Sequence, residues 1–137
     1  MDKTLYVEQK SNYVEFVNQF SVIAQSYLDA IDNNESVVID CQQNNQIDAT
    51  CSQNLFGRLL IHEKVPYVLC KNLNSQPNVV RAIFEGVSRS YKEAYPSGIE
   101  RYGSRVTIPQ IEMFDPSGDK VYSLVKLSDE DHASIKR

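Results

Sequence analysis

Long hydrophobic runs and an excess of basic charge are both missing from this 137-residue sequence. No stretch reaches the roughly eighteen consecutive apolar residues of a membrane span. The N-terminus has no basic segment followed by an apolar run, so we expect no signal peptide and a cytoplasmic protein. The net charge of -4 argues against a nucleic-acid-binding domain, which would present a basic face.

The motifs of the common metal and cofactor sites are also missing. His62 and His132 are far apart, and no C-x-x-C or H-x-x-x-H pair occurs, so we expect no metal centre. Neither G-x-G-x-x-G nor G-x-x-x-x-G-K-[ST] is present, so no phosphate cradle and no cofactor are predicted. Cys41, Cys51 and Cys70 lie within or beside apolar segments, which is typical of reduced, buried thiols.

The residues that are present predict alternating strands and helices. Strands are expected at Thr4–Glu8, at Val37–Ile39 and at Tyr67–Cys70, with helices after Asn12, from Cys51 to Glu63 and after Pro77. Further on, Arg105–Phe114 and Lys120–Leu127 are expected as two strands joined by a proline- and glycine-containing loop. A polar tail, residues 128–137, follows.

Short connections between these elements imply right-handed crossovers and a mostly parallel sheet. With 42% hydrophobic residues, the chain can bury a core of its own. We therefore predict an α/β fold: a single domain over residues 1–127, with a mixed, mostly parallel β-sheet, three main helices and a C-terminal β-hairpin.

One stretch combines a buried strand with a polar helix start. The β-branched run Val37–Ile39 ends in Asp40 and is typical of a strand covered on both faces. Asp48, Thr50 and Ser52 can each offer an oxygen to the unpaired N–H groups of the next helix. This places a capped helix start at the carboxyl end of a strand, where open α/β sheets receive ligands. Asp40 can accept hydrogen bonds from the same loop.

The segments D-A-T-C-S-Q-N-L-F-G-R-L-L (48–60), V-P-Y-V-L-C-K-N-L-N (65–74) and P-N-V-V-R-A-I-F-E (77–85) carry a family resemblance. Over Val37–Val87 the chain resembles the STAS family, the domain of anti-sigma factor antagonists, and most closely the STAS-like group with an L-F-G second helix. The resemblance implies a non-enzymatic regulatory module. Its partner would be a protein, such as a serine kinase or ATPase of histidine-kinase fold or a larger signalling complex, bound through Asp48–Leu60.

The residues expected at that partner surface are Asp48, Ala49, Thr50, Ser52, Gln53 and Gly57, with Asp40 in support. Classical antagonists carry a phosphorylated serine at the position of Ala49. Thr50 is therefore the expected switch hydroxyl, and Ser52 is the second candidate. Gly57 lies off the apolar stripe of its helix, so it is predicted to face solvent and to allow close approach of a partner.

Three other interpretations stay open. Helix capping alone accounts for the residue types at the helix start. A small-ligand or nucleotide sensor could use the same strand-end crevice. A thiol-dependent enzyme could use Cys51, since a helix N-terminus lowers a thiol pKa. His62, however, would lie about 16 Å away along the helix, too far to act as the base.

Overall fold

The computed structural model describes residues 2–94 and 110–124. Within these ranges the elements are β1 (Asp2–Tyr6), α1 (Tyr13–Asp32), β2 (Ser36–Asp40), α2 (Ala49–Ser52), η1 (Gln53–His62), β3 (Tyr67–Lys71), α3 (Pro77–Ala94), β4 (Gln110–Phe114) and β5 (Lys120–Leu124). The described strands form one sheet in the order β1-β2-β3-β4-β5. Neighbours from β1 to β4 run parallel, and β5 runs antiparallel to β4. The predicted single α/β domain with a mostly parallel sheet and three main helices, counting α2 and η1 as one, is confirmed.

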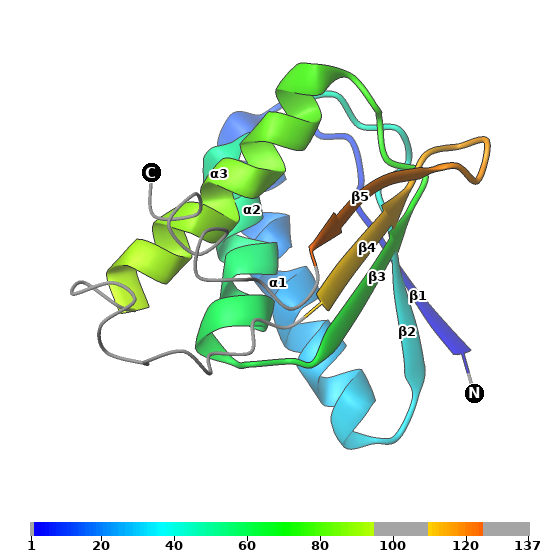
Figure 1. Cartoon of the computed structure of the whole chain (residues 1–137), viewed down its shortest axis with the longest axis vertical. Helices are drawn as coiled ribbons and strands as arrows, with labels where there is room; N and C mark the ends of the chain where they lie inside the picture. Colours follow the sequence, from blue (N-terminus) through cyan, green and yellow to red (C-terminus); the bar gives the residue numbers. More distant parts are fainter. Residues whose placement is uncertain (1, 95–109, 125–137) are drawn as a thin grey trace.

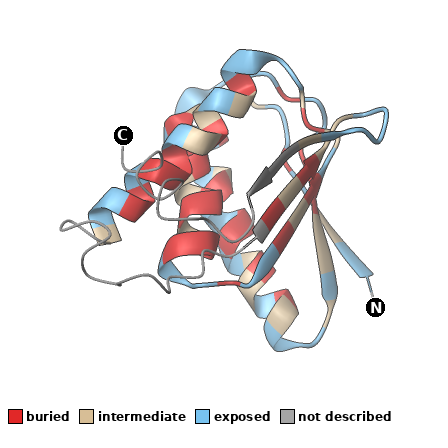
Figure 2. Cartoon of the chain, in the orientation of Figure 1, coloured by how far each residue is buried: buried red, intermediate tan, exposed pale blue. Residues whose placement is uncertain are grey.

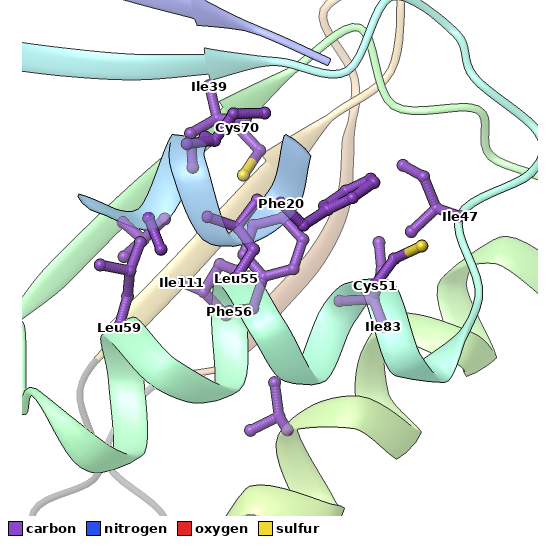
Figure 3. Packing of buried hydrophobic residues seen from close by; sticks show 14 of the residues in the cluster. Phe20, Ile39, Ile47, Cys51, Leu55, Phe56, Leu59, Cys70, Ile83 and Ile111 are labelled. Atoms are coloured by element: carbon purple, nitrogen blue, oxygen red, sulfur yellow. The ribbon is translucent and has the colours of Figure 1, made fainter. Parts of the chain in front are cut away.

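All of the described helices cover the same face of this sheet (Figure 1). Consecutive parallel strands are neighbours, so crossovers of one hand place every connecting helix on one side. Core residues therefore come from one face of the strands and from the helices above it, as Figures 2 and 3 show. The expectation that β2 is covered on both faces is wrong for the described elements: Ile39 is buried under the helices, whereas Val38 is only half-buried.

Helix α1 begins where the sequence predicts. The Asn12 side chain accepts a hydrogen bond from the backbone N–H of Glu15, at 3.1 Å, and so caps the first turn. Phe16, Phe20 and Tyr27 are buried against the sheet and the second helix. This long helix anchors the N-terminal end of the core.

The second helix is wider than an α-helix over most of its length. After one α-helical turn at α2, the ten residues of η1 form a π-helix, and its last turn closes with the N–H of Glu63 bonded to the carbonyl of Arg58. In a π-helix the backbone hydrogen bonds join residues five apart, so the angle between successive side chains around the axis differs from that of an α-helix. The predicted apolar stripe is buried, but so are Gly57 and Ile61, because this helix is covered by α3 as well as by the sheet.

Strands β4 and β5 pair through Glu112↔Ser123 and Ile111↔Leu124. In the connecting turn, the Asp115 carboxylate accepts backbone hydrogen bonds from Ser117 and Asp119, each at 2.9 Å. Parts of the two strands predicted here, residues 105–109 and 125–127, and the polar tail lie outside the described residues. Across the ranges that the structure describes, no helix has the length and apolar character needed to cross a membrane.

Candidate functional site

The carboxyl ends of β2 and β3 are joined through the side chain of Asp40. This side chain is almost fully buried, and its two oxygens accept hydrogen bonds from the Gln42 backbone N–H at 2.9 Å and the Asn72 amide at 3.0 Å. The Gln43 N–H also donates to the Asn72 carbonyl, at 2.8 Å. Asp40 thus accepts a hydrogen bond from the turn that directly follows β2, and it also holds the loop after β3. Neither of these donors belongs to the Asp48–Thr50 segment from which its bonds were expected.

This junction holds three residues in left-handed backbone conformations. The φ angles are +49° at Gln42, +57° at Gln43 and +54° at Asn72. Each such residue costs on the order of 1 kcal/mol unless its surroundings fix it. The hydrogen bonds from Gln42 and Asn72 to Asp40, together with the bond from Gln43 to the Asn72 carbonyl, supply that constraint. The loop leading to α2 therefore leaves the sheet along a defined path.

Asp48 caps the second helix, as predicted, and also binds a residue that the sequence did not indicate. Its carboxylate accepts from the Cys51 N–H at 2.9 Å and from the Tyr13 hydroxyl at 2.6 Å. Burial raises the pKa of Asp48, but the bonds from Tyr13 and Cys51 outweigh it, and the pKa lies below its ordinary value. The same bond to Asp48 is the main reason that the pKa of Tyr13 is raised.

The other two candidate oxygens at the helix start have different environments. The Thr50 side chain is exposed and lies beside the Tyr13 hydroxyl. The Ser52 side chain is buried, and its hydroxyl donates to the Ile83 carbonyl of α3 at 2.7 Å. Ala49 is buried as well. Ser52 and Ala49 are therefore turned into the molecule, and Thr50 is the member of this group that a partner or kinase can reach.

The prediction that Gly57 faces solvent is wrong. Gly57 is buried against α3, where an added Cβ would overlap the Ser90 hydroxyl and lie 2.8 Å from the Ser90 Cβ. One turn away the contact is reciprocal, since a Cβ on Gly86 would lie 2.5 Å from the Ser52 Cβ. The two glycines allow the helix backbones to approach closely. The face expected to receive a partner is therefore occupied by α3.

Gln53 is half-buried at the same helix pair. Its amide lies 3.4 Å from a carboxylate oxygen of Glu93, and His62 Nε2 lies 3.6 Å from the other. Both residues of η1 thus approach one acidic side chain near the end of α3. Gln53 is therefore partly accessible, but its amide faces Glu93 of the molecule's own α3 helix.

Cys51 is fully buried among core side chains (Figure 3). Burial raises the pKa of its thiol to about 12, which is opposite to the effect expected of a helix N-terminus alone. At neutral pH this thiol is protonated and out of contact with solvent. The geometry therefore opposes its use as a nucleophile.

Across the described ranges, no group of three His, Cys, Asp or Glu side chains is arranged to hold a metal ion. No protein-family model, curated protein or solved structure matches this chain with significance. The candidate functional site is therefore the helix start itself, formed by Tyr13, Asp48 and Thr50.

Proposed function

We propose that this chain is a non-enzymatic regulatory module that binds another protein at the start of α2, and that phosphorylation of Thr50 controls the binding. The observation that carries the proposal is the exposure of Thr50 beside a hydrogen-bonded Tyr13–Asp48 pair, while Ser52 and Ala49 are buried. The STAS-like sequence of the second helix supports the same role.

The surface around Thr50 has the composition of a contact site. Tyr13 is 58% exposed and Val14, in the same turn of α1, is 63% exposed. Tyrosine is prominent among residues that contribute strongly to protein interfaces. The exposed Tyr13 ring is held in place by its hydrogen bond to the half-buried Asp48 carboxylate. A partner that binds this ring therefore loses little conformational entropy in fixing it.

A phosphate on Thr50 would act on this anchor through charge. A helix N-terminus tolerates added negative charge, so the fold should persist. The Asp48 carboxylate is ionised at neutral pH because its pKa is low, and it would repel a dianion two residues away. The Tyr13 hydroxyl would then donate its hydrogen bond to the phosphate instead of to Asp48. Phosphorylation would thus change both the charge of the surface around Thr50 and the position of the exposed Tyr13 ring.

Three variants test the proposal: Thr50→Glu, Tyr13→Ala and, as a control for added charge, Ser21→Glu on the exposed side of α1. Affinity capture from native lysate with quantitative mass spectrometry should recover a partner with wild type and Ser21→Glu. Recovery should fall with both site variants, at unchanged melting temperatures. Intact-mass analysis of the protein from cells should find one phosphate, and peptide mapping should place it on Thr50.

Equal recovery of every bound protein by all four forms would count against the binding surface. A phosphate found elsewhere, with Thr50 always unmodified, would remove the switch but leave the binding surface standing.

A further inference from the structure

We draw no further inference here: the strongest candidate, the patch on the sheet face opposite the helices where half-buried Val38 and Leu69 lie beside the exposed rings of Tyr6 and Tyr67, carries nothing because nothing in the described part of the structure shows what covers it.

Discussion

A single added methyl group at Gly57 should destabilise the whole fold. The Cβ of Gly57→Ala would overlap the Ser90 hydroxyl, lie 2.8 Å from the Ser90 Cβ and lie 3.2 Å from the Gly86 carbonyl oxygen. The hydroxyl can rotate away. The Gly86 carbonyl is part of the α3 backbone, and the Ser90 Cβ is bonded directly to that backbone. Neither can rotate away, so η1 and α3 must move apart.

Two effects of opposite sign decide the magnitude. In a free helix, replacing glycine by alanine would stabilise by up to about 1 kcal/mol. Overpacking a closely fitted contact costs about 1–3 kcal/mol. The helix pair also carries the Ser52–Ile83 hydrogen bond, which separation would lengthen. We expect a net loss of about 1–2 kcal/mol in the free energy of unfolding.

Urea unfolding of a double-mutant cycle isolates this contact. Ser90→Gly removes both the Cβ and the hydroxyl that oppose the new methyl group, so Gly57→Ala should cost much less in that background. Ser90→Ala alone should cost little, because the Ser90 hydroxyl is buried with no hydrogen-bond partner in the described part of the chain. Gly57→Ala as stable as wild type, or additive with Ser90→Gly, would refute the close approach of the helices.

Two further predictions concern Asp40 and Cys51. Asp40→Ala leaves the Gln42 N–H and the Asn72 amide without their acceptor and should cost about 1–3 kcal/mol in urea unfolding, unlike the exposed control Asp32→Ala. Because burial raises the pKa of Cys51 from 9.0 to about 12, the unfolded chain releases this proton first as pH rises. Stability should therefore decline from about pH 9 upward, and Cys51→Ala should reduce that decline in urea midpoints; an unchanged decline would contradict this role.

Local sequence signals predicted much of the fold because they depend on near neighbours. The Asn12 cap and the apolar stripe of α1 operate within one or two turns. Asp48 caps through a bond three residues away, and the Leu55–Leu60 stripe identifies the side of the second helix that meets the sheet. Each of these features is determined by a short segment and its periodicity, and each is present in the structure.

The missed features depend on contacts between distant segments. One apolar stripe shows that a helix is buried on one side, but it cannot show that α3 covers a second side, so the pattern alone wrongly places Gly57 at the solvent-exposed surface. Tyr13 reaches Asp48 across 35 positions, and no local pattern links them. Likewise, the β-branched run of β2 does not distinguish a strand covered on both faces from one whose Val38 is half-buried on a face that no described element covers.

The close helix pair also explains why Thr50 suits a switch. Ala49, Ser52 and Gln53 are fixed against Gly86, since a Cβ there would lie 2.5–2.6 Å from their atoms. Ser52 is further tied to Ile83 by its hydroxyl. The backbone on both sides of Thr50 is therefore held by α3, while its side chain faces solvent. A phosphate at Thr50 cannot easily relieve its repulsion from Asp48 by unwinding this turn. The bond between the Tyr13 hydroxyl and the Asp48 carboxylate is the contact that the phosphate can compete for, so the added charge would change the surface and leave the fold intact.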